Sequence, residues 1–132
     1  MTDVLQDLAG TSVFICAPDG APLLDERDAT DLIGNASYAG AAWTVIPAER
    51  FTDDFFRLRT RLAGDIVQKF VTYRMGLAII GDISRHTDGG TALRDFVRES
   101  NRGTQLWFLP DIDALRVRLE RVRLEQGAQG PR

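Results

Sequence analysis

The sequence has few of the residues that support covalent, metal and acid–base chemistry. Among its 132 residues there is one cysteine, Cys16, and one histidine, His86. A single cysteine excludes an intrachain disulfide and a cysteine-based metal cluster, and it is typical of a reducing cytosol. Lysine is equally scarce, because Lys69 is the only one. Schiff-base catalysis therefore has little scope.

Targeting and membrane signals are missing as well. Residues 1–10 contain two aspartates and no basic residue, which is not the charged start of a signal peptide. No apolar run approaches the ~20 residues that a membrane-spanning helix needs. These absences predict a cytoplasmic protein with no membrane partner.

Positive charge is not in excess either. The formal net charge is −3 and the isoelectric point is about 5.1, so no basic field attracts nucleic acid. In residues 111–125 four arginines are balanced by four carboxylates. This balance indicates a solvated helix face laced with salt bridges. We expect no nucleic-acid partner.

The length and composition fit one folded domain. A share of 44% hydrophobic and 27% charged residues is ordinary for a soluble globular protein. A chain of this size buries about two-thirds of the surface that it exposes when unfolded. We place the domain at residues 1–126 and expect the polar residues 127–132 to be a disordered tail.

Short apolar runs bounded by turn residues predict strands, and apolar residues at helical spacing predict the helices between them. The predicted strands are 13–16, 21–24, 43–46, 76–83 and 105–109. The predicted helices are 25–40, 55–73, 91–101 and one that begins at 111. The element order is therefore β-β-α-β-α-β-α-β-α.

The strongest periodic signal lies in residues 55–73. Apolar residues recur there every three or four positions, which predicts one long amphipathic helix. Gly64 in its middle predicts a close approach by another element. Thr91 is expected to cap the following helix, and Gly103 to end that helix in a left-handed conformation.

These elements predict the fold class. Strands separated by helices imply crossover connections, so we expect a single-domain α/β fold with a mixed, mostly parallel sheet of four to five strands and about four helices. An antiparallel pair is expected at the N-terminal hairpin. Nearly unbroken apolar strands are usually covered on both faces. Because about four helices do not suffice for both, an uncovered patch would favour a homodimer.

His86 lies in a polar loop, residues 84–90, directly after a predicted strand. Binding residues often gather at such a place. A Ser-His-Asp triad would need this histidine, but the chain has no Gly-x-Ser-x-Gly elbow, and the pattern favours a solvated loop histidine. Asp82, His86 and Asp88 offer too little nitrogen for zinc, and Gly89-Gly90 lacks the Walker spacing. We therefore predict no catalytic residue, no metal and no cofactor.

Three stretches carry a family resemblance. They read Phe55-Phe56-x-Leu58-x-Thr60-x-Leu62-Ala63-Gly64-x-Ile66-x-Gln68-Lys69-Phe70, then Ala78-Ile79-Ile80-Gly81-Asp82, then Asp95-Phe96-x-x-Glu99-Ser100-Asn101-x-Gly103. Together they resemble the DUF4180 family, a bacterial domain family of unknown function, over about Val13 to Leu115. That resemblance implies no established activity.

The element order after the first hairpin is also similar to that of STAS domains, the anti-sigma-factor antagonists. This looser resemblance implies a STAS-like fold and a regulatory phosphorylation site near Thr52. STAS antagonists usually show an Asp-Ser-Ser/Gly-Gly run, whereas this chain reads Thr52-Asp53-Asp54-Phe55. Two aspartates would repel a phosphate, so we interpret Thr52 as a helix cap.

Two functions are left open by the sequence. The first is a non-enzymatic regulatory or protein-interaction module that binds a protein partner through Thr52, Asp53, Arg57 and the turn at residues 82–84. The second is a small-molecule-binding protein or modest enzyme. Its site would lie at the C-terminal edge of the sheet, formed by Asp82, Ser84, His86, Ser100 and Asn101. A deep polar pocket at that edge would favour the second function, and a flat edge the first.

Overall fold

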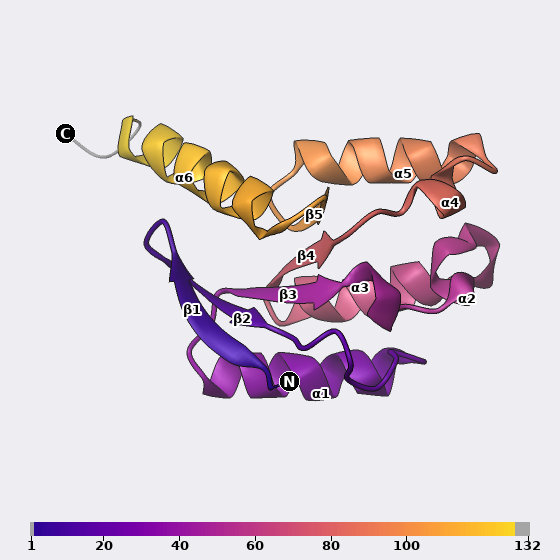
Figure 1. The fold of residues 1–132 in the computed structure, drawn as a ribbon, viewed down its shortest axis with the longest axis horizontal. Helices are drawn as coiled ribbons and strands as arrows, with labels where there is room; N and C mark the ends of the chain where they lie inside the picture. Colours follow the sequence, from indigo (N-terminus) through magenta and orange to yellow (C-terminus); the bar gives the residue numbers. More distant parts are fainter. Residues whose placement is uncertain (1, 129–132) are drawn as a thin grey trace.

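The computed structural model describes residues 2–128 (Figure 1). Its strands are β1 (Val4–Leu8), β2 (Thr11–Ile15), β3 (Trp43–Pro47), β4 (Gly76–Ile80) and β5 (Leu106–Leu109). The α-helices are α1 (Glu26–Tyr38), α2 (Asp53–Phe56), α3 (Leu62–Thr72), α4 (Ser84–Thr87), α5 (Thr91–Arg102) and α6 (Ile112–Ala128). Two short 3-10 helices, η1 (Ala48–Arg50) and η2 (Leu58–Thr60), flank α2.

The strands form one sheet in the order β1-β2-β3-β4-β5. β1 is antiparallel to β2, and the other neighbouring pairs are parallel. This confirms the prediction of a mixed, mostly parallel sheet. Because every parallel connection crosses over through a helix, the strands from β2 to β5 all end at the same edge, near α2 and α4 (Figure 1).

The two faces of the sheet are covered unequally. Helices α1, α3 and α5 and the short α2 pack on one face, which holds the larger core cluster. α1 buries four apolar residues against this face: Ala29, Leu32, Ile33 and Ala36. On the other face α6 buries Leu115 and Leu119, while Ile15, Ile80 and Leu109 stay only half-buried beside it.

Two stacked tryptophans join β3 to β5 beneath α6. The rings of Trp43 and Trp107 lie 4.2 Å apart at an interplanar angle of 22°, and the Arg118 guanidinium lies 4.6 Å from the Trp107 ring centroid. A Cβ atom at Gly76 would come within 2.3 Å of the Trp43 ring. Glycine at this position is therefore what lets the tryptophan lie flat on the sheet.

The N-terminal hairpin differs from its prediction. The strand expected at 13–16 is the second arm of the hairpin, and its partner is β1, which the sequence reasoning missed. Residues 21–24 do not form a strand, because only Leu23 makes an isolated bridge, with Phe51. The apolar part of β1 is short and its first four residues are exposed, so it carried no clear strand pattern.

The long helix predicted over residues 55–73 is also wrong in one respect, because it is broken near Arg57. α2 ends there, and Arg61 has a left-handed φ of 67° before α3 begins. The Thr60 hydroxyl donates to the carbonyls of Asp54 (2.7 Å) and Arg57 (2.8 Å). This hydroxyl competes with helical bonding and fixes the break.

Several local predictions need correction. A Cβ at Gly64 would meet nothing within 4 Å, so no close approach requires that glycine. Gly90, not Thr91, is the N-cap of α5, and Gly103 is extended rather than left-handed. The predicted tail at 127–132 begins too early, because α6 runs to Ala128; residues 129–132 lie outside the described part.

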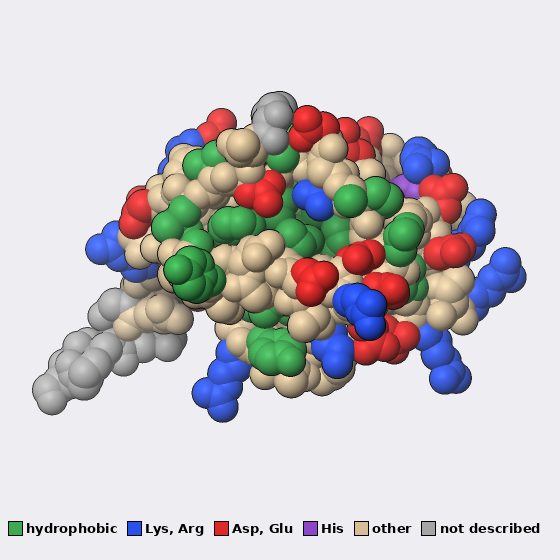
Figure 2. All heavy atoms as spheres, turned by 90° about the horizontal axis from the view of Figure 1, so that it is seen from below, with side chains coloured by type: hydrophobic (Ala, Val, Ile, Leu, Met, Phe, Trp, Pro, Cys, Tyr) green, Lys and Arg blue, Asp and Glu red, His purple; other side chains and the backbone are tan. Residues whose placement is uncertain are grey.

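Charges of both signs are interspersed over the surface. Figure 2 shows one face of the molecule, where red and blue side chains surround a central group of green hydrophobic ones. The larger exposed apolar side chains include Val4, Leu5 and Tyr38. Within residues 2–128, no helix is both long and apolar enough to span a membrane.

Candidate functional site

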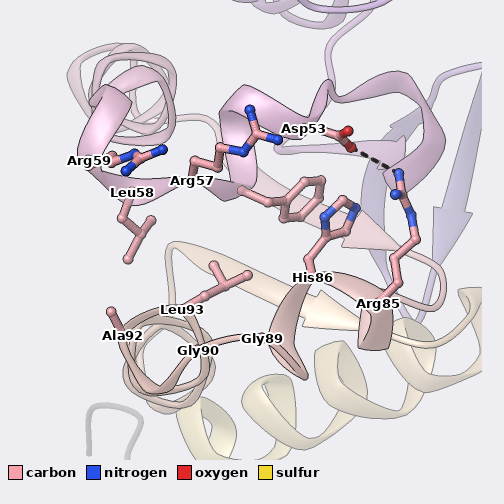
Figure 3. A pocket seen from close by; sticks show the side chains of 11 residues that line it. Asp53, Arg57, Leu58, Arg59, Arg85, His86, Gly89, Gly90, Ala92 and Leu93 are labelled. Atoms are coloured by element: carbon pink, nitrogen blue, oxygen red, sulfur yellow. Dashed lines mark hydrogen bonds and ion pairs between the residues drawn. The ribbon is translucent and has the colours of Figure 1, made fainter.

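The segments that follow β3 and β4 meet at the C-terminal edge of the sheet and enclose a cleft. Its cavity volume is about 540 Å³. One wall comes from α2 and η2, and the other from α4 and the first turn of α5 (Figure 3). The lining residues are Asp53, Phe56, Arg57, Leu58, Arg59, Arg85, His86, Gly89, Gly90, Ala92 and Leu93. We call this cavity the arginine cleft.

Three arginine residues and one aspartate are among the residues that line the arginine cleft. Arg85 pairs with Asp53 across the cleft at 3.1 Å, the dashed contact in Figure 3. Arg57 contacts the neighbouring Asp54 at 3.4 Å, and no carboxylate within residues 2–128 pairs with Arg59. The cleft is thus locally positive on a chain whose net charge is −3.

His86 forms part of the cleft wall and is not a solvated loop residue. It belongs to α4 and its ring stacks on Phe56, with centroids 3.9 Å apart and an interplanar angle of 11°. Burial and the neighbouring Arg85 cation lower the pKa of His86, and the Asp53 carboxylate opposes them. Burial and the Arg85 charge therefore favour the neutral imidazole at pH 7.

The first turn of α5 closes the far wall. Gly90 precedes the helix without a side-chain cap, so the first backbone N–H groups of α5 have no side-chain acceptor among the described residues. Cβ atoms at Gly89 and Gly90 would meet nothing within 4 Å, which leaves this wall open to a ligand. Unpaired N–H groups at a helix start add positive potential to that of the arginines.

Three of the residues singled out from the sequence meet in this cleft: Asp53, Arg57 and His86. Thr52 directly precedes α2 with an extended backbone, but its side chain makes no capping hydrogen bond. Thr52 therefore precedes the helix as predicted but does not form the capping hydrogen bond that a helix cap would make. Thr52 does not line the cleft either.

Asp82 and Ser84 lie at the start of α4 and do not line the arginine cleft. The Ser84 N–H donates to Asp82 Oδ1 at 2.9 Å. Hydrogen bonds from the Ser84 backbone and hydroxyl lower the pKa of Asp82. Both residues line a second cleft of about 540 Å³, whose floor is mostly apolar and includes Ile83, Val97, Phe108, Leu109 and Pro110.

Ser100 and Asn101 line neither of these two clefts, because they lie at the C-terminal end of α5. The Asn101 amide instead pairs with the backbone of Phe108 in β5. Asn101 Oδ1 accepts from the Phe108 N–H at 2.7 Å, and Asn101 Nδ2 donates to the Phe108 carbonyl at 3.2 Å. The ligand-binding role predicted for these two residues stays a prediction.

Sequence reasoning missed Arg59 and Arg85. In an unbroken helix Arg57, Arg59 and Arg61 would point in different directions, so their clustering was not visible. Because of the break at residues 57–61, Arg57 and Arg59 both border one cavity. The signal that could have found it is Thr60, since a β-branched hydroxyl residue favours local backbone bonds over a helix interior.

The cleft residues fall inside a recognised domain. A family model described as "Domain of unknown function (DUF4180)" matches residues 8–119. The chain belongs to the DUF4180 family. No curated protein matches this chain, and no solved structure matches it. The likeness to STAS domains stays a prediction.

The DUF4180 chain holds no evident metal centre in its described part. Within residues 2–128, no group of three or more His, Cys, Asp or Glu side chains is placed to bind a metal ion. Cys16 is buried, and burial together with the nearby Asp3 charge raises the pKa of its thiol to about 12. The thiolate form that would ligate a metal or attack a substrate is therefore not populated near pH 7.

Proposed function

We propose that this DUF4180 protein is a non-enzymatic binding module that holds the anionic group of a small ligand in the arginine cleft. The observation that carries the proposal is that three arginine residues line one cavity on a chain of negative net charge. Guanidinium groups form strong, charge-assisted hydrogen bonds with phosphate and carboxylate oxygens. The open first turn of α5 supplies further donors.

The lining chemistry supports binding rather than catalysis. No hydroxyl, thiol or amine side chain is among the eleven lining residues, so the candidate nucleophiles or bases in the cleft are limited to Asp53 and His86. Its carboxylate, Asp53, is paired with Arg85, and His86 is stacked flat on Phe56. A general base would need a free group directed at the ligand.

A polar pocket at this edge favours the small-ligand function over the protein-interaction function that the sequence also allowed. Arg57 and Arg59 border this cavity from one wall and the first turn of α5 borders it from the other, so an anionic ligand held there would meet donors on both walls. A regulatory role would follow if ligand occupancy altered the surface offered to a protein partner, and that role stays a prediction.

The proposal is tested with inorganic phosphate at constant ionic strength, since salt screens exposed charges. We expect phosphate to raise the unfolding temperature of the wild-type protein by mass action. Arg59→Glu and Arg57→Glu should lose most of that increase. Arg27→Glu on α1 makes the same charge change on an exposed residue outside the cleft and should keep it.

Native mass spectrometry of freshly purified protein complements this titration. A retained anionic adduct that leaves on denaturation would support the proposal, and it should be absent from Arg59→Glu. Equal phosphate responses in the wild type and both cleft variants would contradict it. Each variant should unfold within about 0.5 kcal/mol of wild type, because these positions are exposed. Lost binding would then not reflect lost folding.

A further inference from the structure

β1 forms one outer edge of the sheet, and that edge is uncovered. Residues 4–7 are exposed, and only Leu8 is buried. Val4 is 49% exposed and Leu5 is 47% exposed, one on each face of the strand. β1 is as long as any other strand, so an unpaired ladder of full length borders the solvent.

The hairpin geometry decides which backbone groups are free. Ala9 and Gly10 form the connecting turn with φ values of 53° and 86°, as in a type I′ turn. Leu8 and Thr11 close the hairpin, and the pairs Gln6–Val13 and Val4–Ile15 follow at every second position. In such a ladder the N–H and C=O groups of Leu5 and Asp7 point away from β2.

Natural sheets protect free edges with proline, lysine, bulges or a covering element. β1 has no proline or lysine, and its register with β2 is regular over five residue pairs. At the opposite edge the Asn101 amide already occupies the backbone of Phe108 in β5. The β5 edge is therefore capped, whereas β1 has only the charge of Asp7 against pairing with another strand.

We propose that β1 pairs antiparallel with β1 of a second copy, so that the two sheets become continuous across a two-fold axis. β1 can pair antiparallel with β1 of an identical chain only about a two-fold axis. Such a contact joins two chains and leaves no equivalent free edge for a third, so it forms a closed dimer. It would pair the free groups of Leu5 and Asp7, and it would cover Val4 and Leu5. The arginine cleft lies at the C-terminal edge and stays open in both copies.

Charge selects the register of this pairing. An axis at Leu5 would place Asp3 opposite Asp7 of the second copy, and an axis at Asp7 would place that residue opposite itself. Like charges directly opposite one another destabilise a sheet. An axis at Gln6 instead sets Asp7 opposite Leu5 and Val4 opposite Leu8. This register pairs all five residues of β1 with no like charges opposite one another, so the dimer is centred on Gln6.

The register is tested with single cysteines under mild oxidation. Gln6 would be a non-hydrogen-bonded pair with itself, with Cα atoms about 4.5 Å apart, within the span of a disulfide. We expect Gln6→Cys to form a covalent dimer. Two copies of Leu5→Cys would lie about 8 Å apart at least, because they are offset by two residues, and should stay uncrosslinked. The native Cys16 is buried and does not compete.

A second variant separates dimer loss from misfolding. Leu5→Pro removes an N–H that points outward, so the hairpin bonds survive. We expect wild type to sediment as a dimer and Leu5→Pro as a folded monomer with unchanged circular dichroism. Crosslinking of Leu5→Cys alone or of both cysteine variants would overturn the Gln6-centred pairing. A monomeric wild type whose Gln6→Cys variant does not crosslink would overturn the dimer itself.

Discussion

At the β5 edge of the sheet a side chain takes the place of a neighbouring strand, whereas at the β1 edge nothing within residues 2–128 does so. The Asn101 amide presents one acceptor and one donor to the Phe108 backbone, as a paired peptide group would. The Arg118 guanidinium then donates to the Asn101 carbonyl. Side chains from the C-terminal end of α5 and from α6 thus form the hydrogen bonds that protect this edge within one chain.

The β1 edge keeps its outward backbone groups free, and its strand has apolar side chains on both faces. The contrast shows that one domain can satisfy the outward backbone groups of one edge strand with its own side chains and leave those of the other edge strand unpaired. Intramolecular capping of β5 makes that edge part of the fold, so its loss should appear as lost stability. An unprotected β1 edge is available to another chain, so changes there should appear in association.

The largest effect is expected at the capped edge. Asn101→Leu would leave the N–H and C=O of Phe108 without partners in a partly buried place, and each such group costs about 1–3 kcal/mol. We expect the free energy of unfolding to fall by about 2 kcal/mol or more in urea titrations. Asn101→Asp should lose less, because its carboxylate still accepts from the Phe108 N–H.

Equal stability of Asn101→Leu and wild type would remove the contrast between the edges. The variants also separate folding from association, since neither touches β1. We expect both to keep the oligomeric state of the wild type at concentrations where they are folded. A change of oligomeric state at Asn101 would mean that the β5 edge, not the β1 edge, meets other chains.

The sequence predicted the middle of the sheet better than its edges. The inner strands β3 and β4 are almost wholly buried, so their apolar runs are continuous and easy to recognise. β1 has one buried residue of five and therefore carries little pattern. The cap at β5 depends on an asparagine seven positions away, which no short-range rule identifies.

The candidate site was predicted in part for a similar reason. The C-terminal edge follows from the alternation of strands and helices. The sequence assigned Asp53 and Arg57 to a protein-binding surface and His86 to a separate small-molecule site, whereas all three line one cleft. The cluster of arginines required the helix break at residues 57–61. An unbroken apolar period concealed this break, because the tertiary fold and the Thr60 hydroxyl outweigh helical periodicity there.

An intermediate effect, of opposite sign, is expected at the centre of the sheet. Thr44 in β3 is fully buried, and its hydroxyl has no hydrogen-bond partner within residues 2–128. Thr44→Val keeps the shape and removes the unpaired polar group, so the free energy of unfolding should rise by about 1 kcal/mol. Val45→Thr makes the reverse change at the next position and should lower it. Chemical denaturation of both variants measures the difference.

A lower stability of Thr44→Val would show that the hydroxyl has a partner in solution, such as a buried water. The centre would then resemble the capped β5 edge, where polar groups are satisfied within the fold. A higher stability would show that the sheet centre, like the β1 edge, contains an unsatisfied polar group. Only the second of these can be relieved by another chain.

The smallest expected effect is that of pH on stability, which should not depend on either edge of the sheet. His86 is the only histidine, and its pKa is lowered by burial and by Arg85. A lowered folded-state pKa means that the unfolded chain binds the proton more tightly. Stability is therefore complete above the ordinary pKa value of 6.5 and is lost as the pH falls below it.

His86→Phe keeps an aromatic ring on Phe56 and cannot titrate. We expect the unfolding temperature of wild type, but not of His86→Phe, to decline between pH 7 and pH 5.5. The same decline in His86→Phe would place the titrating group elsewhere, and Asn101→Leu and Leu5→Pro, measured over the same range, would show which edge contains it.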